Sequence, residues 1–153
     1  MKKWMFLFTL MLCLFCAPMT GFAAPTEDEK KQYEEAIADK WIEMLKGSIA
    51  LDKSSADNKT YRLNWLLSEN KPTEAKKLVV KIEKLEKEQE KKQESMDPYI
   101  SAKKTCDEKC NVDGAKAALD NMIRIQKDRQ KAQDELTKLW KKVAAYIEPK
   151  NRT

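Results

Sequence analysis

Residues 115–147 read AKAALDNMIRIQKDRQKAQDELTKLWKKVAAYI. Apolar side chains recur in this stretch at alternating steps of three and four residues, which is the spacing of a heptad repeat on one helix face. Arg129 interrupts that face, which consists of Ala118, Met122, Ile125, Arg129, Ala132, Leu136, Leu139, Val143 and Tyr146. The pattern predicts one helix of about 32 residues, roughly 48 Å long at 1.5 Å per residue, that ends near Ile147 before Pro149.

This face, which we call the C-terminal seam, is longer than a compact domain of this size requires. We therefore expect part of it to contact another helix, either of a partner protein or of a second copy. Arg129 either extends its guanidinium group to water or sets the register by pairing with an acidic residue across the seam. The predicted interaction residues are Met122, Ile125, Arg129, Leu136, Leu139 and Val143.

A second helical pattern begins at Pro72, where proline is tolerated because the first helical N–H needs no partner. Its apolar residues follow the same spacing and then give way to Gln89 and Lys92. An antiparallel pairing with the last helix would place these two polar residues opposite Arg129. The same pairing would bring Ala75, Leu78, Ile82 and Leu85 to Leu136, Leu139 and Val143.

The first helical pattern follows a possible capping box formed by Thr26 and Glu29. A wide apolar face comes next, comprising Ile37, Ala38, Trp41, Ile42, Met44, Leu45 and Ile49. We expect this helix to end near Leu51, because residues 52–60 are rich in Ser, Asp and Asn, which favour loops. Residues 61–68 then predict a short helix or a wedge at one end of the bundle.

The clearest helix-breaking signals in the second half of the chain lie at Asp97-Pro98 and at residues 106–114. The residue before proline is disfavoured in the helical conformation, so the second long helix should stop or kink there. A short helical stretch over residues 99–104 and a hinge loop at about 106–114 follow. The sequence thus predicts an all-α fold in one domain, residues 24–153: a three- to four-helix bundle or an extended antiparallel helical hairpin with a long C-terminal helix.

Residues 1–23 have the order of a secretory signal peptide. Lys2 and Lys3 precede an apolar run that is shorter than the roughly 20 residues of a membrane span. Gly21 and Ala23 supply small residues for cleavage after Ala23. The expectation is an exported protein, periplasmic or extracellular, whose membrane contact is at most peripheral.

The chain contains no histidine, which excludes Ser-His and Cys-His nucleophiles and the zinc sites that use imidazole. Its carboxylates lie in runs interleaved with lysine, which is typical of solvated helix faces. No glycine-rich phosphate loop is present, and a formal net charge of +5 is modest for a nucleic-acid-binding protein. We therefore expect no enzymatic activity, no cofactor, no bound metal and no nucleic-acid partner.

Cys106 and Cys110 are the remaining pair of residues that could form a disulfide or a reactive site. In an exported protein, two cysteines favour a disulfide, although a regular helix would hold their β-carbons about 5–6 Å apart, farther than a disulfide allows. A bond would therefore require a non-helical turn near Asn111 and Gly114. The alternatives are a redox pair, a soft-metal site completed by Met96 or Met122, and bonding to a partner chain.

These observations support three hypotheses of function. The first is a non-catalytic cell-envelope protein that acts by helix-to-helix contact with a protein partner or with a second copy. The second is a periplasmic inhibitor or immunity-type protein that inserts the 106–110 loop into a target. The third is a thiol-redox or soft-metal-binding protein that uses Cys106 and Cys110.

Overall fold

The computed structural model describes residues 24–147 and is all-α, with no strand in that range. Its helices are α2 (Glu27–Leu67), α3 (Thr73–Glu94), α4 (Asp97–Glu108) and α5 (Val112–Ile147). The prediction of an all-α fold with a long C-terminal helix is confirmed. The predicted signal peptide, residues 1–23, lies outside the described residues, as does Pro149.

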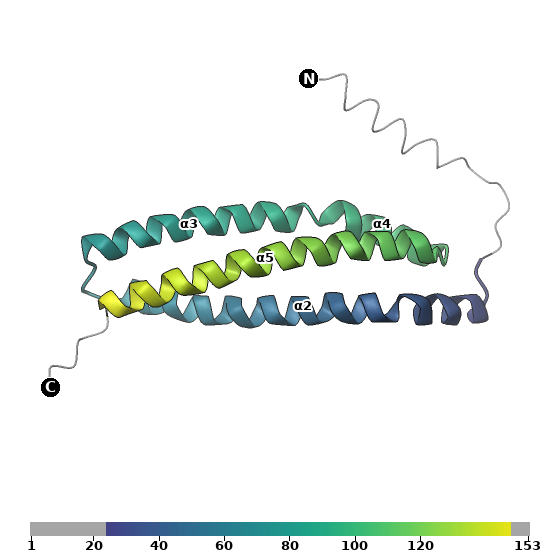
Figure 1. The fold of residues 1–153 in the computed structure, drawn as a ribbon, viewed down its shortest axis with the longest axis horizontal. Coiled ribbons are helices and arrows are strands. Elements are labelled where there is room, and N and C mark those ends of the chain that lie inside the picture. Colours follow the sequence, from purple (N-terminus) through teal and green to yellow (C-terminus); the bar gives the residue numbers. More distant parts are fainter. Residues whose placement is uncertain (1–23, 148–153) are drawn as a thin grey trace, which may run out of the picture.

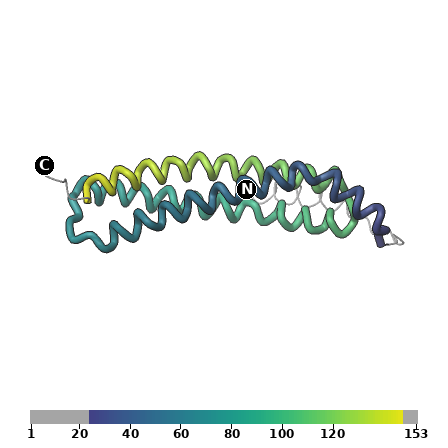
Figure 2. Tube along the Cα trace, turned by 90° about the horizontal axis from the view of Figure 1, so that it is seen from below, coloured from purple at the N-terminus to yellow at the C-terminus, as the bar shows by residue number. Residues whose placement is uncertain are grey.

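The four helices form three long rods, because α3 and α4 lie nearly end to end (Figure 1). The chain runs out along α2, returns along α3 and α4, and runs out again along α5, parallel to α2. Figure 2 shows the same lengthwise arrangement from a second direction. The fold is therefore a three-rod bundle, one of the expected forms, and the two-helix hairpin is excluded.

Helix α5 is the central rod. It packs closely against α2, α3 and α4, whereas α2 has few close backbone contacts with α3 or α4. The C-terminal seam is long because α2, α3 and α4 pack against α5 along most of its length. Since α2 and α3–α4 stand apart, a groove remains between them with α5 as its floor.

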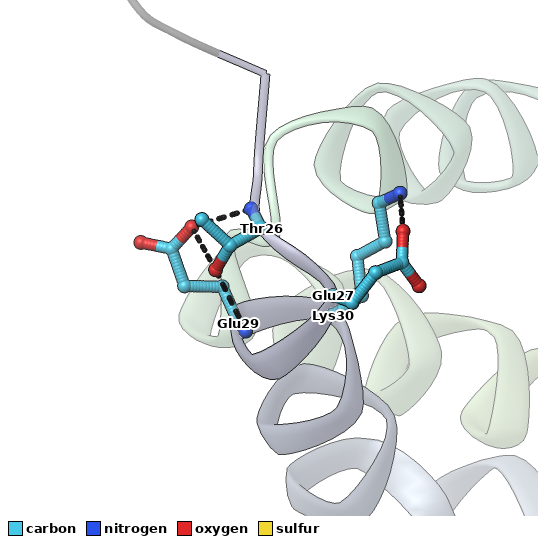
Figure 3. A network of polar contacts seen from close by, with 4 residues as sticks. All are labelled: Thr26, Glu27, Glu29 and Lys30. Carbon is cyan, nitrogen blue, oxygen red and sulfur yellow. Dashed lines mark hydrogen bonds and ion pairs between the residues drawn. The ribbon is translucent and has the colours of Figure 1, made fainter.

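The N-terminus of α2 carries the expected capping box (Figure 3). The Glu29 amide donates to Thr26 Oγ1 at 3.3 Å, and the Thr26 amide donates to Glu29 Oε2 at 2.7 Å. These bonds satisfy donors that the first helical turn leaves unpaired. They hold the pKa of Glu29 below its usual value, the backbone bond contributing most. The predicted helix start is confirmed.

The prediction that the first helix ends near Leu51 is wrong, since α2 continues without interruption to Leu67. Residues 52–60 are not a loop, and residues 61–68 are not a separate helix or wedge. The reason is a buried heptad on α2 that carries polar residues at some positions. Its buried members are Tyr33, Ile37, Met44, Leu51, Asn58 and Trp65.

Polar side chains on α2 remain helical because α5 supplies their hydrogen-bond partners. Gln126 Nε2 donates to Ser48 Oγ at 2.7 Å, and Thr137 Oγ1 donates to Asn58 Oδ1 at 3.0 Å. Serine and asparagine disfavour helices mainly when their side chains compete for local backbone groups. Here the bonds cross between helices, so that local competition is removed.

Two apolar clusters form the core at opposite ends of the rods. The first contains Tyr33, Ile37, Met44, Met96, Ala115, Leu119, Met122 and Ile123. The second contains Trp65, Ala75, Ile82, Leu136, Trp140 and Val143, with Leu78, Leu85 and Leu139 packed against it. The second cluster confirms the antiparallel pairing expected between α3 and the C-terminal half of α5.

The boundary between α3 and α4 lies at Ser95 and Met96, just before the predicted Asp97-Pro98 break. Pro98 occupies the first turn of α4, where it costs no hydrogen bond. At this break between α3 and α4, the Met96 side chain lies in the first apolar cluster. Helix α4 reaches Glu108, so the short helical stretch expected over residues 99–104 extends at both ends.

Replacing Asn58 with leucine is expected to raise the free energy of unfolding by about 1 kcal/mol, because it removes an unpaired buried donor. Asn58 is only 6% exposed, and its Nδ2 has no partner among residues 24–147. In the variant, the single proton of the Thr137 hydroxyl can be donated to the Gln133 carbonyl oxygen, 3.0 Å from Oγ1. Urea unfolding measures the change, with the exposed Asn64→Leu as control; a destabilised Asn58 variant would contradict the prediction.

Candidate interaction surfaces

The predicted interaction residues on α5 lie inside the bundle. Met122 belongs to the first apolar cluster, and Leu136 and Val143 belong to the second. Ile125 and Leu139 are partly buried and pack against these clusters. Apart from Tyr146, which is 45% exposed, the C-terminal seam is therefore largely covered by the chain's own helices, and a partner would need a different surface.

Arg129, the interruption of the seam, lies between the two clusters and faces α3. Its backbone carbonyl accepts from Gln89 Nε2 at 2.7 Å, and its Nη2 donates to Gln93 Oε1 at 2.9 Å. Burial lowers the pKa of Arg129, while the nearby Asp52 opposes that change. The expected position opposite Gln89 is confirmed. An acidic partner across the seam is one of the two alternatives for Arg129; the guanidinium group instead bonds to the Gln93 amide oxygen, and Lys92 is exposed.

The groove between α2 and α3 is polar where it passes Arg129. It forms a hollow of about 330 Å³, spanned by the ion pair from Arg62 Nη2 to Glu86 Oε2 at 2.6 Å. Asn58 Nδ2, Gln89 Oε1 and Arg129 Nε have no hydrogen-bond partner within the described range. An apolar partner helix would have to cover the partly exposed charged groups that line this hollow, such as Arg62 and Glu86, which costs free energy. This part of the groove is therefore a poor docking surface for such a helix.

At the other end of the groove, side chains from α2 and α4 line a hollow of about 650 Å³. The Tyr33 hydroxyl donates to Asp107, which also accepts from Lys103 Nζ at 2.8 Å. Lys103 Nζ lies 4.4 Å from the centroid of the Trp41 ring, a cation–π contact. Burial raises the pKa of Tyr33, and the neighbouring Asp107 carboxylate raises it further. This polar cluster ties α4 to α2.

Cys106 and Cys110 flank the turn between α4 and α5, and both thiols are free in the structure. Cys106 lies in the last turn of α4, so the predicted hinge loop is shorter than residues 106–114. Cys110 has a φ of 50°, a left-handed conformation in a non-helical turn. The turn is closed by the Asn111 amide, which donates to the Cys106 carbonyl oxygen at 2.9 Å. The disulfide stays a prediction.

Gly114, in the first turn of α5, lies close to Cys106. A β-carbon there would lie 2.6 Å from Cys106 Sγ, so only glycine leaves the thiol its space. Burial raises the pKa of Cys106, with Asp107 adding to the effect. A raised pKa leaves less thiolate at neutral pH, which weighs against redox or metal chemistry at this thiol.

Alkylation of reduced Cys106 is expected to be slower than that of a free thiol at the same pH. The raised pKa shifts the rise of its rate to higher pH, since only the thiolate reacts. Iodoacetamide labelling of the Cys110→Ser protein across a pH series, followed by mass spectrometry, measures this rate. A profile that coincides with that of a small unhindered thiol would contradict the prediction.

A row of exposed apolar side chains lies on α2, along the flank that borders the groove. We call it the outer stripe; its apolar members include Ile42, Leu45, Ile49, Leu63 and Leu66, all exposed. Ile49 reaches 68% exposure and Leu67, at the edge of the stripe, 72%. The sequence pattern counted Ile42, Leu45 and Ile49 as part of one buried face. Only Ile37 and Met44 of that face are fully buried, whereas Trp41 is partly covered by Lys103.

Within residues 24–147, no helix is both long enough and apolar enough to span a bilayer. The same range holds no cluster of three or more residues suited to binding a metal. Comparison of the chain with protein-family models, curated proteins and solved structures finds no match. Any proposal about function must therefore rest on the surfaces described above.

Proposed function

We propose that this protein is an exported, non-catalytic helical protein of the cell envelope that acts by helix-to-helix contact through the outer stripe of α2. The observation that carries the proposal is the exposure of Ile42, Leu45 and Ile49 on one helix face, with Leu63 and Leu66 farther along it. Single apolar residues are common on protein surfaces, but an ordered row of them marks a contact site. The signal-like order of residues 1–23 supports export.

The burial pattern of the bundle supports the same proposal. Helix α5 is covered on several sides by the chain's own helices, whereas α2 is covered mainly by α5. A further helix lying along the outer stripe would remove large aliphatic side chains from water, at about 25 cal/mol per Å² of apolar area. The mixed Lys and Glu surface elsewhere offers no comparable gain, because exposed ion pairs contribute little.

Variants on the stripe test this proposal in the cell envelope. A Leu45→Glu/Ile49→Glu protein is compared with Val80→Glu, which alters an exposed apolar residue on α3, 65% exposed. After chemical crosslinking in intact cells, we expect the unaltered protein and the Val80 variant to give the same stoichiometric crosslinked species. The stripe variant should lose it. A crosslinking pattern indifferent to the stripe variant would refute the proposal.

A further inference from the structure

The outer stripe has a regular spacing that extends beyond its apolar residues. Positions 42, 45, 49, 52, 56, 59, 63 and 66 alternate steps of three and four residues, and every one of them is exposed. A row with this spacing runs straight along a helix that supercoils with a partner. It covers 24 residues between its ends, or about 36 Å at 1.5 Å per residue. The stripe therefore has the geometry of an unused coiled-coil seam.

The residue order along the outer stripe is complementary to that of the same stripe running in the opposite direction. Its two ends are apolar, with Ile42, Leu45 and Ile49 before the centre and Leu63 and Leu66 after it. Its centre holds Asp52, Ala56 and Lys59, and Asp52 and Lys59 also border the polar hollow between α2 and α3. If a second copy lies antiparallel, Ile42 meets Leu66 of that copy and Leu45 meets its Leu63. Ile49 then packs on the aliphatic stem of Lys59, and Asp52 faces the small Ala56.

Charge favours the antiparallel over the parallel orientation. A parallel, in-register pair would set Asp52 against Asp52 and Lys59 against Lys59, which is repulsive. In the antiparallel register, Asp52 of one copy lies one layer from Lys59 of the other, and symmetry repeats this favourable contact. Lys53 of one copy lies beside Lys53 of the other at the edge of the contact. Both side chains are exposed to water there, so their repulsion is screened.

We propose that the partner at the outer stripe is a second copy of this chain, so that two α2 helices pack antiparallel about a two-fold axis near Ser54 and Ser55. The inference rests on the proposed function and names its partner. An isologous contact of this kind uses the same surface on both chains and closes at the dimer. Each dimer would then contain six rods, with the two α2 helices at the centre.

The test uses charged residues at two positions that this register brings together. The protein is purified after expression of the full-length gene, kept under reductant so that Cys106 and Cys110 form no intermolecular bonds, and studied by sedimentation equilibrium. The variants are Leu45→Glu, Leu63→Lys and the two combined, with Val80→Glu as control. These positions are exposed, so helix content by circular dichroism should remain unchanged.

We expect the unaltered protein and the Val80 variant to be dimers. Each single stripe variant should raise the dimer dissociation constant more than about tenfold, because it places a charge against an apolar side chain. The combined variant should recover most of that loss, since the carboxylate introduced in one copy would then face the ammonium group introduced in the other. Recovery in the combined variant is specific to the proposed register.

Three outcomes would overturn the inference: a monomer at about 100 µM, well above the micromolar affinities of weak specific complexes; a dimer that the stripe variants leave intact; or a combined variant no better than the single ones. A monomeric protein whose envelope crosslinks still depend on the stripe would leave the proposed function standing with a different partner. Loss of that dependence would refute the proposed function itself.

Discussion

Replacing Trp140 with alanine is expected to lower the free energy of unfolding by about 3–5 kcal/mol. Trp140 is 1% exposed and joins α5 to α2 and α3 in the second apolar cluster. Its removal takes away one of the two tryptophan side chains of that cluster and leaves a cavity that the surrounding helices can close only in part. Because domains of this size are stable by about 5–15 kcal/mol, the loss is a large share of the total.

Urea unfolding followed by circular dichroism measures this loss. Trp41→Ala is the matched control, because Trp41 is a tryptophan of the same chain that lies at the surface under Lys103. We expect the control to lose under about 2 kcal/mol, from partial burial and one cation–π contact. Equal losses for the two variants would contradict the position of Trp140 at the centre of the cluster.

Replacing Leu119 with alanine is expected to cost about 2–5 kcal/mol, the usual range for a buried leucine. Leu119 is 0% exposed and lies in the first cluster with Met44, Met96 and Met122. Methionine side chains adapt to irregular space, so they should fill part of the cavity and place the loss in the lower half of that range. Leu67→Ala, at a 72% exposed position, should change stability by under about 0.5 kcal/mol.

Hydrogen exchange should locate the two losses at opposite ends of the molecule. Leu119→Ala should speed amide exchange in α4 and in the first halves of α2 and α5, because those segments surround the first cluster. Trp140→Ala should speed exchange in α3 and in the second halves of α2 and α5. A uniform increase in both variants would show that the polar residues between the clusters do not separate them energetically.

Two of the predicted helices were identified correctly because their signals are local and repeated. The heptad of residues 118–146 and the weaker one from Ala75 to Leu85 both lead to the observed pairing. The capping box at Thr26 is also a local signal, since its bonds join residues three apart. Each heptad is complete within two turns and then recurs, and the capping box is complete within one turn.

The continuity of α2 could not be predicted from the same kind of signal. Its buried heptad includes Asn58, and the positions between include Gly47 and Ser54. Read locally, Ser54 and Asn58 favour a loop. Their helical state depends on Gln130 and Thr137, which lie far away in the sequence on α5. The seven-residue spacing of Ile37, Met44, Leu51, Asn58 and Trp65 is the sequence signal for this rod, once a polar residue is allowed at a heptad position.

The sequence by itself determined the all-α class, the start of α2, the presence of one long C-terminal helix and its antiparallel pairing with α3, because helix periodicity and capping are properties of neighbouring residues; α5 begins at Val112, a few residues before the predicted start near Ala115. Only the tertiary structure decided that α2 is one rod of 41 residues, that the C-terminal seam is buried within the chain, and that Ile42, Leu45 and Ile49 face outward. The physical reason is that a wide apolar face on one helix does not specify which part the neighbours cover. Because α5 packs against the side of α2 that carries Met44 and Leu51, these residues are buried and the outer stripe stays exposed to water.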